Sequence, residues 1–339
     1  MLVDAFDGTM LDGEAEWLKR IVGDLSDDDQ KLVYADWLEE QGSDRAAYVR
    51  GIVAASKSMS ADDLPAAKGI PTGWQEIIGG RLIELLCHAE AGEIRDKAIE
   101  FARPCLCVES EPTDDDDIPV GTSKSGGLPD LPAGYTWPPG GDCHAIYNDD
   151  TGGTERLAGF LAQVNLDEIV SSQAAIHSGI PQTGLLSFFC FQDFENDNPD
   201  AIGVMAVHFK DTSTLVRTEP PEELTEGNGT SDPAVLKFHE SLDLPEGGKW
   251  SDGPWGKELI SSEGEEFEGV TDQIRSDNFN NMLGYGRATT GDDPTPNRES
   301  RHLVLLETVY ECRVHIQIPA DDLKAGNFDK ITLDWVDFD

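Results

Sequence analysis

Residues 160–166 read FLAQVNL, and this run decides the fold of the larger part of the chain. It is a short apolar stretch that contains two amides, Gln163 and Asn165, as a buried strand can. Similar runs recur between glycines and prolines. They predict strands at 158–164, 184–191, 202–209, 213–217, 302–309, 312–318 and 330–336. The intervening stretch 218–300 is acidic and rich in Gly and Pro, and it predicts long loops with one helix at about 233–241.

The N-terminal part has a different period. Its apolar residues recur at helical spacing, so this part predicts a small helical unit. Ser26 is the predicted N-cap of the second helix and Gly42 its left-handed end. The predicted helices cover residues 14–22, 31–41, 44–55 and the amphipathic stretch 74–86.

The change of period falls near residue 100 and predicts two domains. We expect a helical domain at 1–100, an acidic linker or surface loop at 101–120 and a β-rich domain at 121–339. The linker is predicted from Pro104 and from the aspartate run 114–117. The predicted fold class is therefore α+β, with the helices first.

The chain is strongly acidic. Its 339 residues contain 25 Lys and Arg against 66 Asp and Glu, which gives a formal net charge of −41. Such a charge excludes a conventional nucleic-acid binder and disfavours docking on an anionic membrane. Evenly spread acid has two interpretations. It can be a solvated surface adapted to salt or to the cytosol, or a face that attracts a basic protein.

The cysteines do not predict a metal site or a disulfide framework. Cys105 and Cys107 are spaced C-x-C and Cys143 precedes His144, whereas structural zinc sites prefer C-x₂₋₄-C pairs. The first residues have no basic and apolar leader pattern, and no stretch has the apolar length of a membrane helix. We therefore expect a cytoplasmic protein with reduced thiols, no cofactor, no metal and no membrane contact.

Two stretches resemble known families. Residues 32–42 read LVYADWLEEQG and are followed by Asp44-Arg45 and Tyr48. This string is similar to the short repeat-companion domain of planctomycetes and myxobacteria, over roughly residues 12–55. That domain occurs attached to very different proteins, so the resemblance implies an adaptor role and assigns no chemistry.

The second part resembles the YwqG-like family, a bacterial domain of unknown function, over roughly residues 103–338. The opening SKSGGLPDLP at 123–132 with Trp137-Pro138 carries the resemblance first. The strand 160–166, the stretch PQTGLLSFF at 181–189, the string LGY at 283–285 and the closing VHIQIPADDL at 314–323 follow in order. The resemblance implies a β-rich fold and no reaction.

The opening segment supplies the candidate site residues. Gly126 and Gly127 permit a tight turn, Pro129 and Pro132 stiffen an extended path, and Trp137 ends it, so we expect a structural clasp. Lys124 is expected on the surface. Gln163 and Asn165 either pin their strand to this segment or line a ligand pocket together with Lys124. No catalytic residue is predicted, because no catalytic motif is present.

These observations lead to one function and one alternative. The function is that of a non-catalytic cytoplasmic interaction module, immunity- or regulator-like, whose acidic surface recognises a basic protein. The alternative is an enzyme or small-ligand-binding protein with a pocket near the SKSGGLPDLP segment.

Overall fold

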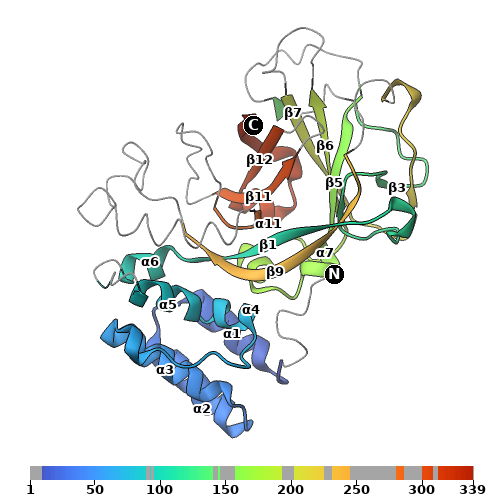
Figure 1. Ribbon diagram of the computed structural model, residues 1–339. Coiled ribbons are helices and arrows are strands. Elements are labelled where there is room, and N and C mark those ends of the chain that lie inside the picture. Colours follow the sequence, from blue (N-terminus) through green and yellow to red (C-terminus); the bar gives the residue numbers. More distant parts are fainter. Residues whose placement is uncertain are drawn as a thin grey trace.

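The computed structural model describes residues 10–88, 92, 95–139, 144–145, 157–192, 202–224, 231–244, 280–285, 300–307 and 312–338. A helical unit comes first and a curled antiparallel sheet follows it (Figure 1). This arrangement confirms the α+β class predicted from the sequence.

The helical unit consists of α1 to α6. The bounds are α1 Glu14–Gly23, α2 Asp28–Glu40, α3 Arg45–Ser58, α4 Thr72–Ile77, α5 Gly80–His88 and α6 Arg95–Phe101. The N-cap of α2 is Asp27 and not the predicted Ser26, because the Asp27 carboxylate accepts a hydrogen bond from the Gln30 amide at 2.8 Å. Gly42 adopts the predicted left-handed conformation after α2, with φ of 73°.

The main sheet has eight strands in the order β10-β1-β9-β2-β5-β6-β7-β4, and all of its pairings are antiparallel. Its bounds are β1 Arg103–Pro112, β2 Lys124–Ser125, β4 His144–Ala145, β5 Gly159–Asn165, β6 Leu185–Gln192, β7 Ile202–Phe209, β9 Ala234–Asp243 and β10 Asn281–Met282. Two smaller sheets and three short helices complete the described fold. They are β11 Ser300–Glu307, β12 Cys312–Pro319 and β13 Thr332–Phe338, then β3 Asp130–Pro132 with β8 Leu215–Arg217, and α7 Leu166–Ile169, α8 Gln173–Ser178 and α11 Ala320–Ala325.

The seven strands predicted from the sequence are all present, but the helix predicted at 233–241 is wrong. That stretch is β9, in which Ala234, Leu236 and Phe238 are buried and the residues between them are partly exposed. This alternation has the period of a strand, and pairing with β1 along its whole length stabilises it. The prediction of a loop over 101–120 is also wrong in part, because residues 103–112 form β1.

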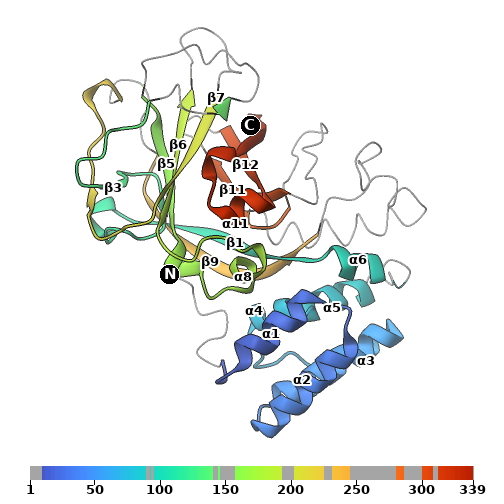
Figure 2. The same cartoon turned by 180° about the vertical axis from the view of Figure 1, so that it is seen from behind.

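The ribbon formed by β1 and β9 connects the two parts of the molecule (Figures 1 and 2). At one end of the ribbon, Leu242 and Leu244 pack into the core of the helical unit. At the other end, Leu236 and Phe238 belong to the core beneath the sheet. The ribbon therefore contributes apolar side chains to both cores, and each core is complete only when the ribbon is in place.

Candidate functional site

The segment that opens the β-rich part turns tightly at two glycines. Gly126 and Gly127 have φ of 63° and 62°, a region that favours glycine. A Cβ on Gly126 would lie 2.4 Å from the Asp232 carbonyl oxygen, and one on Gly127 would lie 2.7 Å from an Asp115 carboxylate oxygen. Glycine is therefore required at both positions, because of the positive φ and because other segments of the same chain lie too close for a Cβ atom.

Lys124 is not on the surface, which corrects the expectation from the sequence. Its side chain is completely buried, and Nζ donates to Asp115 Oδ1 at 2.6 Å and to the Leu128 carbonyl. Burial lowers the pKa of Lys124, against the hydrogen bond to Asp115. Burial also works to raise the pKa of Asp115, but the hydrogen bonds from Lys124 and from the Leu128 amide outweigh it and hold that pKa below its usual value.

Arg217 closes the network from β8. Its Nε donates to Asp130 Oδ1 at 2.7 Å, and Nη1 lies 2.7 Å from Asp115 Oδ1. The same guanidinium donates to the carbonyls of Asp115 and Ile118 at 2.6 and 2.8 Å. Asp115, read from the sequence as part of a solvated acidic run, is therefore an internal counter-ion for two cations.

Gln163 and Asn165 connect β5 to the opening segment. Gln163 Oε1 accepts from the Asp130 amide at 3.0 Å, and Nε2 donates to the Thr122 carbonyl and to Asp130 Oδ2 at 2.8 and 2.6 Å. Asn165 Nδ2 donates to the Gly121 carbonyl at 2.8 Å. These contacts attach β5 to the opening segment, and the ligand-binding role of the two amides stays a prediction.

Trp137 ends the segment against the sheet. The indole is 8% exposed, its Nε1 donates to the Ala158 carbonyl at 2.7 Å, and its ring meets Phe189 edge-on at 6.0 Å. Pro132 lies in β3, and the Pro129 carbonyl accepts from the Thr218 amide at 2.9 Å. The structure thus brings Lys124, Gln163, Asn165 and the turn residues close together. The polar groups of these three side chains bind other groups of the same chain.

A second buried polar centre lies in the helical unit. Glu14 is fully buried and accepts hydrogen bonds from both terminal nitrogens of Arg45, Nη1 and Nη2, at 2.7 and 2.9 Å. Its Oε1 also accepts from the Tyr34 hydroxyl at 2.5 Å and from Trp74 Nε1 at 3.0 Å. Burial, and then the Glu14 charge, raise the pKa of Tyr34 above its ordinary value. Four helices are joined through this one carboxylate.

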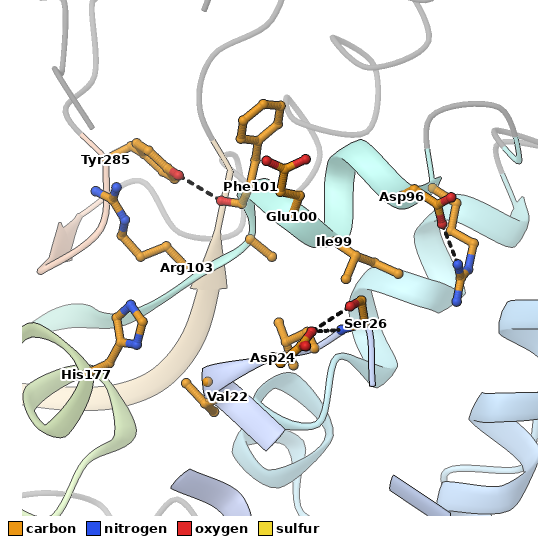
Figure 3. Close-up of a pocket in the computed structure, with 14 residues that line it drawn as sticks. Val22, Asp24, Ser26, Asp96, Ile99, Glu100, Phe101, Arg103, His177 and Tyr285 are labelled. Carbon is orange, nitrogen blue, oxygen red and sulfur yellow. Dashed lines mark hydrogen bonds and ion pairs between the residues drawn. The ribbon is translucent and has the colours of Figure 1, made fainter. Parts of the chain in front are cut away.

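A pocket of about 730 Å³ lies where the helical unit meets the ribbon (Figure 3). Asp24, Ser26, Asp96 and Glu100 line it from the helical unit, and His177 of α8 lines it from the other side. Asp24 Oδ1 accepts from the Ser26 hydroxyl at 2.5 Å. This volume is within the range of small-molecule sites. The side chains that line the pocket include both acidic and basic hydrogen-bonding groups.

Arg103 and Tyr285 complete the wall of the pocket. The Arg103 guanidinium lies 3.9 Å from the centre of the Tyr285 ring, and the Tyr285 hydroxyl donates to the Phe101 carbonyl at 2.8 Å. The Tyr285 amide donates to Asp243 Oδ2 at 2.7 Å. Gly284 leaves room for that contact, because a Cβ there would lie 2.5 Å from the same oxygen. The string LGY at 283–285 was the only signal in the sequence that could have pointed to this wall.

A metal centre is not formed by the residues that the structure describes, since nowhere among them do three His, Cys, Asp or Glu side chains gather around one point. Cys105 and Cys107 lie on β1, His144 on β4, and Cys143 is outside the described residues. In the same part of the chain, each helix is too short or too polar to cross a membrane.

Comparison with known proteins gives one match. The model of a family described as a domain of unknown function (DUF1963) matches residues 123–336. The matched region starts at the buried opening segment and includes the main part of the sheet. No curated protein matches the chain.

Proposed function

We propose a function for this chain as a member of the DUF1963 family, to which it belongs because the family model covers more than half of its length. The function is that of a non-catalytic, cytoplasmic protein-interaction module, immunity- or regulator-like, that recognises a basic protein through its acidic surface. The family description assigns no activity, so the support comes from charge and burial.

The observation that carries the proposal is the imbalance of charge on the surface of the helical unit. Its exposed acids are Asp12, Glu16, Asp24, Asp29, Asp36, Glu39, Glu40, Asp44, Asp62, Asp63, Asp96 and Glu100, and its exposed bases are Lys19, Arg20, Lys57 and Lys68. Several other bases of the helical unit are buried or already bind an acid of the same unit. Arg45 and Lys31 are buried, and Arg50 binds both Asp36 and Glu39, at 2.7 and 2.6 Å.

Such a surface acts at long range. A net charge of −41 creates a negative potential that speeds the encounter with a cationic partner and repels nucleic acid and anionic lipid. We therefore propose that the partner is a protein, because a protein can present a basic face that is complementary to this acidic surface.

Two finer assignments belong to this proposal. The first hundred residues act as a repeat-companion-like attachment, and residues 121–339 as a YwqG-like domain. The buried Cys87 thiol, which lies 3.7 Å from the Ala55 carbonyl oxygen, supports a reducing compartment such as the cytoplasm.

Affinity capture from the native host, followed by reconstitution with the purified candidate, tests the function. We expect a stoichiometric complex with a protein of high pI that dissociates as salt rises, because the attraction is screened. A stoichiometric partner that is acidic, or a complex that salt leaves intact, would contradict the proposal.

A second candidate function is the binding of a small polar ligand. The pocket of about 730 Å³ favours it. Lys124 and Gln163, two of the three ligand-site residues predicted from the sequence, are fully buried, so we place the ligand between the helical unit and the ribbon. A ligand that raises the melting temperature of the wild-type chain, but not that of His177→Ala, would establish this function.

A further inference from the structure

We infer that the outward face of α2, together with Trp17 of α1, is the surface that binds an arginine-containing segment of the basic partner. We call it the α2 face and define it by Trp17, Asp29, Val33, Asp36, Trp37 and Glu40. This inference rests on the proposed function and names the place and the chemistry of contact.

The α2 face follows from helical spacing. Residues 29, 33, 37 and 40 follow one another at steps of three or four positions, and Asp36 lies three positions after Val33 and four before Glu40, so these side chains lie along one side of the helix. Figures 1 and 2 both show α2 on the part of the helical unit that is away from the sheet. Nothing in the described fold packs over this side closely enough to bury Val33, which is 54% exposed.

Val33 is the apolar residue of the face that the fold does not bury, whereas Trp17 and Trp37 pack partly against the core of the helical unit and stack on Tyr34. Val33 is the most exposed of the large hydrophobic residues that the structure describes. A valine at an exposed helix position has poor helix propensity and leaves apolar surface in water. Trp37 is only partly buried and lies against Trp17, with ring centres 6.1 Å apart. Partly exposed tryptophans are typical of protein-binding surfaces, where Trp, Tyr and Arg are enriched.

The charges of the face select the partner. Within Asp28–Glu40 the single base is Lys31, which is buried and therefore does not neutralise the surface. Asp36 and Glu39 are 72% and 68% exposed and share one guanidinium, that of Arg50. Asp29 and Glu40 are also exposed. The face is thus negative around an aromatic centre.

A guanidinium fits both properties of the face. It can stack on an indole while its N–H groups bind a carboxylate, which an ammonium does less well. The helical unit already uses this contact, because Arg20 lies 5.4 Å from the ring centre of Trp17 and Arg45 lies 5.2 Å from that of Trp74. The guanidinium of an arginine from the partner would stack on the Trp37 indole in the same way and form an ion pair with Asp36 or Glu40.

The test uses the full chain and labelled hexa-arginine and hexalysine peptides as probes. Asp36→Lys with Glu40→Lys reverses the face, and Asp62→Lys with Asp63→Lys is the matched control, since Asp62 and Asp63 are exposed acids on another part of the same unit. At moderate salt we expect the face variant to weaken hexa-arginine binding by about tenfold and the control by about threefold or less. Unchanged melting temperatures show that both variants fold.

Trp37→Leu separates stacking from charge. We expect wild type to prefer hexa-arginine over hexalysine, and the variant to lose this preference while it still binds hexalysine. Equal weakening by the two reversals, or a preference that persists in Trp37→Leu, would overturn the assignment of the face. If wild type bound neither peptide, the proposed function itself would fail, so the two failures are distinct.

Discussion

Lys124 Nζ lies 2.6 Å from Asp115 Oδ1 in a place where no part of the lysine side chain reaches solvent. The pair joins β2 to the aspartate run that precedes it, and Arg217 binds the same carboxylate from β8. A buried charged group is stable only beside an opposite charge. The contact between Lys124 and Asp115 therefore fixes the position of the opening segment.

Lys124→Ala should therefore destabilise the protein clearly. Breaking a buried ion pair by removing one partner costs about 3–5 kcal/mol, and Arg217 still compensates part of the Asp115 charge, so we expect about 3 kcal/mol. Denaturant unfolding measures this loss. Lys57→Ala is the control, because Lys57 is 58% exposed and 3.9 Å from its acid, and it should change stability little. Equal midpoints for the two variants would contradict the buried pair.

Glu14→Gln should unfold the helical unit more easily. The substitution keeps the shape of the side chain but removes the Glu14 charge, which lies 2.7 Å from the buried Arg45 guanidinium. We expect a loss of about 3 kcal/mol, since breaking a buried ion pair by neutralising one partner is costly. Glu16→Gln on the exposed side of the same helix is the control. Circular dichroism against denaturant measures both, and a loss confined to Glu16→Gln would refute the role of Glu14.

Glu240 should make stability depend on pH. Burial raises its pKa to about 8, against a hydrogen bond from the Gln173 amide. An unfolded glutamate has a pKa of about 4.3, so between about pH 4.3 and 8 the folded protein holds a proton that the unfolded chain has released. In that window the Glu240 contribution to the free energy of unfolding falls as pH rises, by at most about 1.4 kcal/mol per unit, and it is constant outside the window.

Glu240→Gln isolates this contribution from that of the other acids. Relative to wild type, the variant should gain stability between pH 5 and pH 8 and show little further change at higher pH. Glu219→Gln, an exposed acid after β8, should follow the wild-type profile. Chemical unfolding at several pH values measures the differences. Parallel profiles for wild type and Glu240→Gln would show that Glu240 is ionised in the folded protein throughout.

Trp137→Ala should remove the clasp. Truncation of a buried indole costs about 3–5 kcal/mol, and the Ala158 carbonyl also loses its donor. Tyr135→Ala, two residues away at a ring that is 37% exposed, is the control and should cost less. Thermal unfolding checks the order, and a larger loss for Tyr135 would contradict the clasp.

The helices and strands could be predicted from the sequence better than the contacts that each of them makes in the fold. Helical spacing and alternating runs are local, so the first three helices and seven strands could be found from one stretch at a time. The strand β9 was predicted as a helix, because its stabilising partner β1 is more than a hundred residues earlier in the chain. Its alternation of buried and partly exposed residues was present in the sequence but was short and interrupted by acids.

The candidate site shows the same limit. Gly126 and Gly127 could be selected as structural residues from the sequence, whereas for Gln163 and Asn165 the sequence left a structural role and a ligand-binding role open. The burial of Lys124 could not be predicted, since it depends on Arg217, which lies on another strand and binds both Asp115 and Asp130. The pocket wall at Arg103 and Tyr285 is equally non-local, because 181 residues separate Arg103 from the Gly284 carbonyl that it contacts.

The ribbon that serves both cores has a consequence for the synthesis of the protein. The helices up to Phe101 leave the ribosome first, but Leu242 and Leu244, which pack among them, are made much later. At roughly 5–20 residues per second, the nascent helical unit waits about 7 to 30 seconds for these side chains. During that time its core has an open apolar side. A chaperone that holds this side, or rapid translation of the intervening stretch, would determine how much of the chain reaches the native state.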